Sequence, residues 1–307
     1  MINNSYLKQM INQILVAPPK LILPEQNDSR IQEAQNELLD IGFNIVDIKT
    51  FSDFDLYKEH LKTKKFTYNW TDDMLEDYIQ NPLAKALILL DLGYADCLVA
   101  GADNSTANVI RTSLRIVGLN KSTKWVSSCF FLINPNNQKG YTYADCGVIP
   151  EPDSEQLVSI AYQAYRMHKL ISNEEPKLAF LSFSTKGSAE HYKVKRMQEA
   201  VKMFSKKYPD IIHEGEIQFD AAINSAVASK KIDNSILNGE ANVFIFPDLG
   251  SGNIAYKITQ YLAGYSAWGP LLQGFKKPIH DLSRGCSVDD IVCVSSIAAI
   301  EALKNKD

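Results

Sequence analysis

Short apolar runs alternate with amphipathic stretches along most of the chain, and this alternation constrains the fold more than any other feature. The runs have strand length, and the stretches between them repeat apolar residues at helical spacing. Such a succession is the signature of a mostly parallel sheet covered by helices on both faces, so the sequence predicts an α/β fold. The predicted strands are 20–23, 43–48, 96–100, 125–133, 178–184, 243–246 and 267–273. The predicted helices are 28–41, 83–92, 105–116, 154–170, 189–208, 253–263 and 287–303.

One segment interrupts this rhythm with a turn signal. The turn consists of Pro135, Asn136, Asn137 and Gly140. Residues 141–148 then have the pattern of a second hairpin arm. The length of 307 residues, at roughly 150 residues per domain, predicts two domains. No repeat or long linker separates them, so we expect the two to pack closely.

The charge balance argues against a dedicated nucleic-acid binder. Lys and Arg number 32 against 36 Asp and Glu, which gives a formal net charge of −4. Binding to a phosphate backbone needs a basic surplus or stripe. A few local cations would still suffice for one small phosphorylated ligand.

Membrane and export signals are not evident. The most apolar stretch, 86–100, is interrupted by Asp91 and Asp96, so no membrane helix is expected. The amino terminus has no basic segment followed by an apolar one, which argues against a signal peptide. The cysteines form no CxxC pair, which argues against a zinc knuckle or a disulfide scaffold and predicts a reduced, cytoplasmic protein. They are Cys97, Cys129, Cys146, Cys286 and Cys293.

Ligands of open α/β sheets bind beyond the carboxyl ends of strands, where helices begin, and four such junctions stand out. The first, 101–111, has Ser105 and Thr106 at a helix start and Arg111 inside the helix. This suits a phosphate, but a helix cap with a surface arginine is the alternative. The second has Ser184 and Lys186 in a turn that resembles an anion cradle. A capped turn with an exposed lysine is the alternative there.

The third junction carries Gly250, Gly252 and Ala255 at the spacing of a loose dinucleotide fingerprint. That fingerprint needs an acidic residue about 20 positions further on, to hold the ribose hydroxyl. No Asp or Glu occurs from Asn253 through His280, so the interpretation as an NAD site fails.

The fourth junction opens the last predicted helix and has two competing interpretations. Ser287 and Asp290 have the spacing of a capping box, which would engage both side chains structurally. Ser283 and Arg284 nevertheless place a hydroxyl and a planar guanidinium just before the amino terminus of that helix. Cys286 lies near the helix amino terminus, where a thiolate is favoured. Spacing alone leaves the role of this junction open.

The histidines show no metal-binding spacing, and a metal site is not indicated. Most stand in polar surroundings, so we expect surface or helix-capping positions. His280 is the histidine nearest in sequence to Cys286 and would be its partner if that cysteine were catalytic. The histidines are His60, His168, His191, His213 and His280.

Taken together, these segments resemble the phosphate acetyltransferase family. The most telling one is Asp281-Leu-Ser-Arg-Gly-Cys-Ser-Val-Asp-Asp-Ile291, which occurs with 239–257 and 269–278 in the order of the family's motifs. The resemblance covers residue 84 to the carboxyl terminus, whereas the first 80 residues match poorly. Shorter segments of similar sequence are 101–111, 143–146, 182–188 and 215–222.

The resemblance implies two α/β/α domains of the isocitrate/isopropylmalate-dehydrogenase-like type, with the active site in the cleft between them. The domains would be residues 1–122 with 276–307, and residues 123–275. It also implies a homodimer that converts acetyl-CoA and phosphate reversibly into acetyl phosphate and CoA. No metal or prosthetic group is expected, and the partners are these small molecules, with neither nucleic acid nor membrane.

Individual roles follow from position in the family's motifs. Asp290 matches the base that takes the proton from the CoA thiol, and Ser283 matches the hydroxyl that hydrogen-bonds the reacting carbonyl. Arg284 and Arg111 match arginines that hold phosphate or CoA. The further residues expected to contact substrate or CoA are Ser105, Thr106, Ser184, Lys186, Asn253, Lys257 and Cys286.

A departure from the family concerns residues 61–65, where an additional arginine often contacts CoA. Only Lys62, Lys64 and Lys65 are present here. Lysine offers a point charge where arginine offers a fork, so this contact is in doubt. Such a basic run is otherwise typical of a solvated face.

Three other functions stay open. A phosphate butyryltransferase has the same fold, and the Ser-Arg-Gly-Cys-Ser run favours the acetyl enzyme over it. A non-catalytic acyl-CoA-sensing domain follows a long catalytic partner, for which this chain has no room. A dehydrogenase of this fold is disfavoured by the missing acidic residue and the missing metal-binding carboxylates.

Overall fold

The computed structural model describes residues 4–136 and 139–305. Asn137, part of the predicted turn, lies outside them. Within the described residues, no helix is long and apolar enough to cross a membrane. The chain divides into two compact units, and each is described by itself: unit 1 is Met1–Val126 with Gly269–Asp307, and unit 2 is Ser127–Trp268. The domain boundaries predicted from the sequence stay a prediction.

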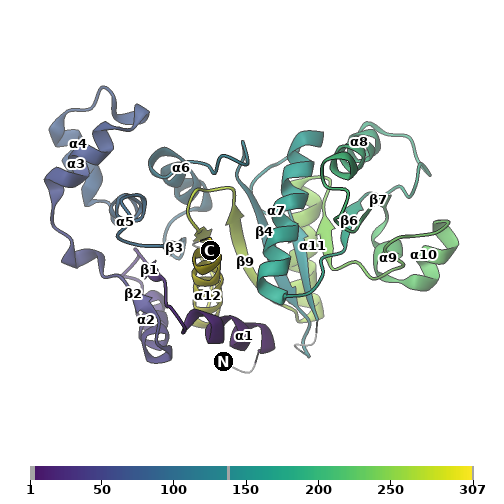
Figure 1. Cartoon of the computed structure of the whole chain (residues 1–307), viewed down its shortest axis with the longest axis horizontal. Helices are drawn as coiled ribbons and strands as arrows, with labels where there is room; N and C mark the ends of the chain where they lie inside the picture. The colour runs from purple at the N-terminus through teal and green to yellow at the C-terminus, as the bar shows by residue number, and fades with distance from the viewer. Residues whose placement is uncertain (1–3, 137–138, 306–307) are drawn as a thin grey trace. The chain divides into compact units, whose positions relative to one another are not determined.

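Unit 1 is built on a four-stranded sheet in which all neighbouring strands are parallel (Figure 1). The carboxyl ends of parallel strands share one edge, and the chain leaves that edge through loops that lead into helices. Asp281, the last residue of its strand, pairs in register with Ala100. In spatial order the strands are β10 (Ile279–Asp281), β3 (Cys97–Ala100), β1 (Lys20–Ile22) and β2 (Asn44–Ile45).

Helices cover both faces of this sheet (Figure 1). α12 (Val288–Lys304) packs on β1, β3 and β10 and is buried over most of its length, because its middle turns contain almost only apolar and small residues. α1 (Ser5–Ile14) and α2 (Ser29–Ile41) pack on α12. On the other face, α5 (Pro82–Asp91) contacts β3 and α6 (Thr106–Ile116) contacts β10. The remaining elements are η1 (Ile48–Thr50), α3 (Phe54–Lys62), η2 (Lys65–Thr67) and α4 (Asp72–Gln80).

The second sheet is mixed and has six strands, five of which lie wholly in unit 2. The sixth, Ser266–Gln273, continues from unit 2 into unit 1. The predicted hairpin is confirmed as the antiparallel pair of β4 and β5, and the pairs β5–β8, β8–β6 and β6–β7 are parallel. In spatial order the strands are β7 (His213–Ile217), β6 (Leu178–Leu181), β8 (Val243–Ile245), β5 (Gly140–Ala144), β4 (Ser127–Ile133) and β9 (Ser266–Gln273).

Helices also pack on the sheet of unit 2. α7 contacts β4, β5 and β8, α8 contacts β6 and β7, and α11 lies against β4 and β5. A Cβ at Gly252 of α11 would lie 2.5 Å from the carbonyl oxygen of Asp145, so only glycine allows this helix to approach the end of β5. The helices are α7 (Ser154–Ser172), α8 (Tyr192–Lys207), α9 (Phe219–Ile223), α10 (Ser225–Lys231) and α11 (Leu249–Ala263).

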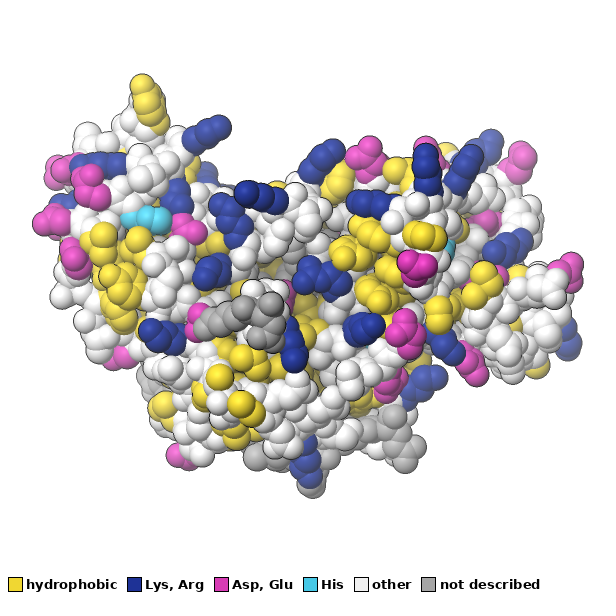
Figure 2. Space-filling view, viewed as in Figure 1, with side chains coloured by type: hydrophobic (Ala, Val, Ile, Leu, Met, Phe, Trp, Pro, Cys, Tyr) yellow, Lys and Arg dark blue, Asp and Glu magenta, His cyan; other side chains and the backbone are white. Residues whose placement is uncertain are grey.

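These elements confirm the predicted α/β class and every predicted strand and helix, although several strands are shorter. The strand predicted at 178–184 ends at Leu181 because the next residues turn around a buried carboxylate. The sequence prediction missed the helices α1, α3, α4, α9 and α10 and the strands β7 and β10. The face drawn in Figure 2 carries both basic and acidic side chains.

Candidate active site

Three neighbouring loops at the carboxyl edge of the unit 1 sheet form the candidate active site. Each follows a strand and ends in a residue that caps the next helix: Asp28 caps α2, Ser105 caps α6 and Ser287 caps α12. Because β1, β3 and β10 are adjacent, these loops lie side by side. They comprise residues 23–28, 101–105 and 282–287.

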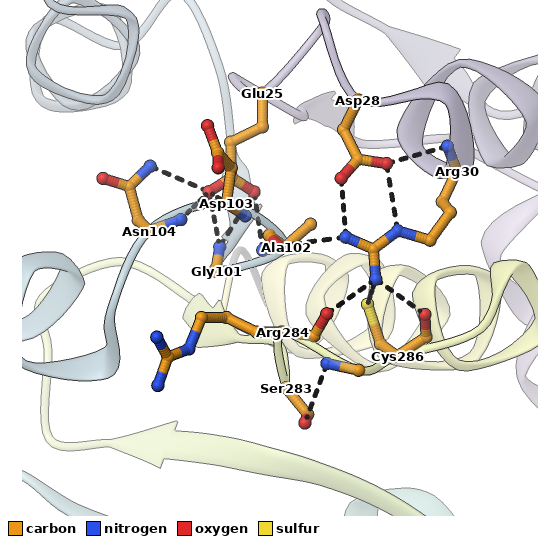
Figure 3. A network of polar contacts seen from close by, with 11 residues as sticks. Glu25, Asp28, Arg30, Gly101, Ala102, Asp103, Asn104, Ser283, Arg284 and Cys286 are labelled. Atoms are coloured by element: carbon orange, nitrogen blue, oxygen red, sulfur yellow. Dashed lines mark hydrogen bonds and ion pairs between the residues drawn. The ribbon is translucent and has the colours of Figure 1, made fainter.

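The loop after β10 carries two predicted catalytic residues, Ser283 and Arg284, and both are exposed. The N–H of Cys286 donates to the carbonyl oxygen of Ser283 at 2.9 Å and closes a tight turn. In Figure 3 the Arg284 guanidinium extends away from the neighbouring polar network. It makes no hydrogen bond or ion pair with any described residue, so it is available to an anionic ligand.

Asp290 lies in the first turn of α12 and forms the predicted capping box with Ser287. The N–H of Ser287 donates to Oδ2 of Asp290 at 2.9 Å, and the N–H of Asp290 donates to Oγ of Ser287 at 3.2 Å. Oδ1 of Asp290 accepts no hydrogen bond from residues 4–136 or 139–305. The carboxylate therefore caps the helix through one oxygen and leaves the other able to accept a proton.

A buried carboxylate organises the loop after β3. Glu25 is 8% exposed, and its two oxygens accept from the backbone N–H groups of residues 101–104 at 2.8 to 3.1 Å. The side-chain amide of Asn104 adds a further hydrogen bond at 2.8 Å (Figure 3). Successive N–H groups aimed at one anion form a nest, and here the anion belongs to the protein. These N–H groups are therefore not available to a phosphate.

Arg30, in the first turn of α2, bonds to all three loops (Figure 3). Its Nε and Nη2 donate to the two oxygens of Asp28 at 3.0 and 2.6 Å. Nη2 also donates to the carbonyl oxygen of Ala102 at 3.0 Å. Nη1 donates to the carbonyl oxygens of Arg284 at 2.8 Å and Cys286 at 3.0 Å. The bond from Arg30 holds the pKa of Asp28 below its usual value.

Thr106, the first residue of α6, contacts Asp281, the last residue of β10. Its Oγ1 donates to Oδ2 of Asp281 at 2.5 Å, while Oδ1 of this buried aspartate has no hydrogen-bond partner within the described residues. Burial raises the pKa of Asp281, and the hydrogen bond from Thr106 lowers it by less. The resulting pKa is about 7. Oδ1 would lie 2.3 Å from a Cβ at Gly101, whose φ of +112° also requires glycine.

The structure corrects the expectation that Cys286 favours a thiolate. Its side chain is 6% exposed, and burial raises the pKa of the thiol to about 11 although Arg30 lowers it. The thiol is therefore protonated at neutral pH, which argues against a nucleophilic role. His280 is not placed as its partner, because Nε2 of this buried ring lies 3.2 Å from Oε2 of Glu301.

The other predicted residues of unit 1 lie on α6 or just before it. Oγ of Ser105 accepts from the N–H of Asn108 at 3.3 Å, which confirms the helix cap. Arg111 is exposed, and its guanidinium makes no hydrogen bond or ion pair within the part of the chain that the structure describes. Because α6 contacts β10, Arg111 and Arg284 belong to adjacent elements.

Four predicted binding residues belong to unit 2. Oγ of Ser184 donates to a carboxylate oxygen of Glu216 at 2.9 Å, and the N–H of Gly187 donates to the same oxygen at 2.6 Å. The predicted anion cradle thus binds a carboxylate of the protein, while Lys186 donates to the carbonyl oxygen of Gly215 at 3.2 Å. Asn253 donates to the carbonyl oxygen of Cys146 at 3.1 Å, and Lys257 is exposed. Substrate contacts by Ser184, Lys186, Asn253 and Lys257 stay a prediction.

A cavity of about 590 Å³ adjoins the loop after β1. Its lining includes two lysines, Lys49 and Lys85, together with Phe54 and the amino-terminal residues of α5. Burial lowers the pKa of Lys85, whose Nζ lies 5.7 Å from the centre of the Phe54 ring. The cavity therefore combines two cations and an aromatic ring with the carboxylates of Glu25, Asp28 and Asp103.

Two histidines correct the expectation of surface or capping positions. His168 and His280 are fully buried. Nδ1 of His168 lies 2.9 Å from Oγ1 of Thr142, and burial lowers the pKa of this histidine to about 3. No group of three or more His, Cys, Asp or Glu residues suited to a metal ion occurs in the described part of the chain.

The basic run near residue 62 is only partly a solvated face. Lys62 and Lys65 are exposed, and Lys62 pairs with Glu59 at 3.0 Å. Lys64 is half-buried and forms an ion pair with Asp91.

Sequence reasoning missed Glu25 and Arg30. The pattern that marked the other loops as candidate sites is present here too. Glu25, Asp28 and Arg30 follow an apolar strand and precede or begin a helix. The partners of these two side chains lie far away in sequence, so the pattern alone did not indicate what they bind.

Comparisons with known proteins agree with one another. The family model described as phosphate acetyl/butaryl transferase matches residues 5–299. A phosphate acetyltransferase of Acetivibrio thermocellus is 37% identical over 97% of this chain and 98% of that protein. A solved phosphotransacetylase from Streptococcus pyogenes has a TM-score of 0.89 at 33% identity, over 99% of this chain and 100% of that one. EutD phosphotransacetylase from Staphylococcus aureus has a TM-score of 0.83 at 34% identity, over 97% and 98%. The family match begins at residue 5, so the resemblance extends beyond the predicted limit at residue 84.

Proposed function

The chain belongs to the phosphate acetyl/butaryl transferase family, and from that premise we propose that it transfers an acetyl group reversibly between CoA and phosphate. The observation that carries the site assignment is the exposed turn of Ser283 and Arg284 with Asp290 beside it. The turn supplies a hydroxyl donor and a cation, and Asp290 supplies a carboxylate oxygen; neither the cation nor that oxygen has a partner within the described residues. Acyl transfer to or from phosphate needs these three kinds of group.

In the direction of acetyl-CoA formation, the CoA sulfur attacks the carbonyl carbon of acetyl phosphate. The C–S bond forms, the bond from that carbon to the phosphate oxygen breaks, and inorganic phosphate leaves. Asp290 accepts the thiol proton at Oδ1, and the hydroxyl of Ser283 donates to the carbonyl oxygen as negative charge grows there. Arg284 and Arg111 pair with the departing phosphate.

Proton transfer is the demanding step of this mechanism. A free Asp carboxyl titrates near ~3.9 and a thiol near ~8.5, so moving the proton between them costs roughly 6 kcal/mol. The guanidinium groups of Arg284 and Arg111 reduce this cost if they stabilise the thiolate as it forms.

The cavity beside the loop after β1 is our candidate for the phosphorylated nucleotide end of CoA. Lys49 and Lys85 would pair with its phosphates, and Phe54 offers a ring surface. Ser184, Lys186, Asn253 and Lys257 are retained as proposed contacts to substrate.

The finer architecture also belongs to this proposal. It comprises the isocitrate-dehydrogenase-like arrangement with an active site in the cleft between two domains, a homodimer, a cytoplasmic location and catalysis without metal or prosthetic group. These features come from the family resemblance, and each stays a prediction.

The test incubates the purified protein with acetyl-, propionyl- or butyryl-CoA, with and without phosphate. The free CoA released is measured by thiol titration. We expect release from acetyl-CoA to be fastest and to require phosphate. Faster release from butyryl-CoA would make the protein a phosphate butyryltransferase. The absence of phosphate-dependent release from every acyl-CoA would overturn the catalytic proposal.

A further inference from the structure

The guanidinium of Arg30 uses all its donors on the protein itself. A guanidinium has five N–H groups, and the hydrogen bonds of Arg30 to oxygen number five. Two go to the carboxylate of Asp28 and three go to backbone carbonyl oxygens. Arg30 therefore has no donor left for a substrate, in contrast to Arg111 and Arg284, whose guanidinium groups bind none of the residues that the structure describes.

The backbone acceptors of Arg30 lie on the two loops that carry the proposed catalytic groups. Ala102 belongs to the loop after β3, and Arg284 and Cys286 belong to the turn after β10. These acceptors are 72, 254 and 256 residues from Arg30 in sequence. One side chain thus fixes the position of the turn relative to its neighbour.

The turn needs such support because its own hydrogen bonds are few. Within the turn, the N–H groups of Gly285 and Cys286 both donate to Ser283, at 3.3 Å to Oγ and 2.9 Å to the carbonyl oxygen. These bonds shape the turn. The N–H of Leu282, just before the turn, donates to the carbonyl oxygen of Ala100 at 2.8 Å, and beyond that point Arg30 binds the backbone of Arg284 and Cys286. Figure 3 shows Arg30 bonded to the backbone of Arg284, whose side chain extends in another direction.

Glu25 holds the loop after β3, to which Arg30 also binds. It holds residues 101–104 by their N–H groups, and Arg30 binds a carbonyl oxygen in that segment. The loop after β3 is therefore bound by Glu25 as acceptor and by Arg30, at the start of α2, as donor. Arg30 binds the turn after β10 at the same time.

We propose that Arg30 is a positioning residue for acyl transfer, which sets the turn of Ser283 and Arg284 in its catalytic position. This inference rests on the proposed function. Displacement of a catalytic group by about 1 Å costs on the order of 10²-fold in rate, and a lysine has no planar fork to reach these acceptors together. The loss should fall on kcat, because Arg30 does not contact substrate.

The test compares Arg30→Lys and Arg30→Ala with wild type in the acetyl phosphate and CoA assay, with circular dichroism to confirm folding. We expect kcat to fall about 10²-fold, with KM for both substrates within about threefold. Guanidinium chloride at millimolar concentration should restore part of the kcat of Arg30→Ala but not of Arg30→Lys. The matched control is Arg196→Lys, since Arg196 bonds likewise to a carboxylate, of Glu151, and to a carbonyl oxygen, of Pro247.

The outcomes separate this inference from the proposed function. If wild type turns over and folded Arg30→Lys keeps a normal kcat, the positioning role is wrong while the function stands. If wild type itself shows no phosphate-dependent turnover, both are wrong. Should both Arg30 variants fail to fold, Asp28→Asn is the alternative. It keeps the helix cap and the arginine but leaves only one side-chain oxygen for the two hydrogen bonds from Arg30. We then expect about a tenfold loss of kcat, and an unchanged kcat would overturn the inference.

Discussion

Ser287 and Asp290 exchange backbone-to-side-chain hydrogen bonds across the first turn of α12, at 2.9 and 3.2 Å. The exchange engages Oδ2 of Asp290 and leaves Oδ1 without a partner within the described residues. Capping and proton transfer therefore need not compete for the same oxygen. The two interpretations that the spacing left open are compatible at this residue.

Replacement of Asp290 by asparagine separates these two roles. Asparagine keeps a side-chain oxygen for the cap but accepts a proton poorly, so we expect kcat to fall by roughly 10²- to 10⁴-fold. The melting temperature should change little, because asparagine can still accept from the N–H of Ser287 and the loss of one charge in the first helical turn costs at most about 1 kcal/mol. Steady-state kinetics and thermal unfolding measure both. Asp289→Asn, at the exposed neighbouring position, is the control. A normal rate for Asp290→Asn would end the general-base assignment.

Replacement of Glu25 by glutamine should destabilise unit 1. The amide nitrogen of glutamine would face N–H donors that now point at a carboxylate oxygen, and charge-assisted hydrogen bonds would be lost. We expect a loss of about 2–4 kcal/mol in the free energy of unfolding, measured by urea titration. Glu33→Gln, an exposed position on α2, is the matched control. Equal stability of the two variants would contradict the nest as a stabilising feature.

The features that sequence could predict are those that local spacing determines. Ser105 caps its helix through a residue three positions away, and so does Ser287, so both caps follow from short motifs. Strand and helix positions follow from the period of apolar residues in the same way.

The remaining features depend on contacts between distant segments. Glu25 binds N–H groups 76 to 79 residues away, and Arg30 binds carbonyl oxygens more than 250 residues away. The high pKa of Cys286 depends on its burial, whereas its position near a helix start predicted the opposite shift. Tertiary packing decides each of these properties, and no local pattern encodes it.

The buried carboxyl of Asp281 predicts a distinct pH dependence of stability. Its pKa is about 7 in the folded protein and near 3.8 when exposed, so the folded state binds this proton more tightly. Its contribution to stability is complete below pH ~4 and is lost as pH rises to about 7, up to roughly 4 kcal/mol. In Asp281→Asn the side chain does not titrate, so its stability relative to wild type should increase over that interval. Urea midpoints from pH 4.5 to 8 measure this, with Asp289→Asn as control, and parallel profiles for Asp281→Asn and wild type would contradict it.

Lys85 tests the proposed site for the nucleotide end of CoA. Methionine is similar in length and keeps the apolar stem beside Phe54 but removes the charge. A charge-assisted hydrogen bond contributes about 1.5 kcal/mol, so Lys85→Met should raise KM for CoA roughly tenfold, with kcat and KM for acetyl phosphate within about twofold. Lys20→Met is the control, because Lys20 is exposed at the amino end of β1, away from the loops. An unchanged KM for CoA would place the nucleotide elsewhere, while a loss confined to kcat would indicate that Lys85 acts on the reacting groups.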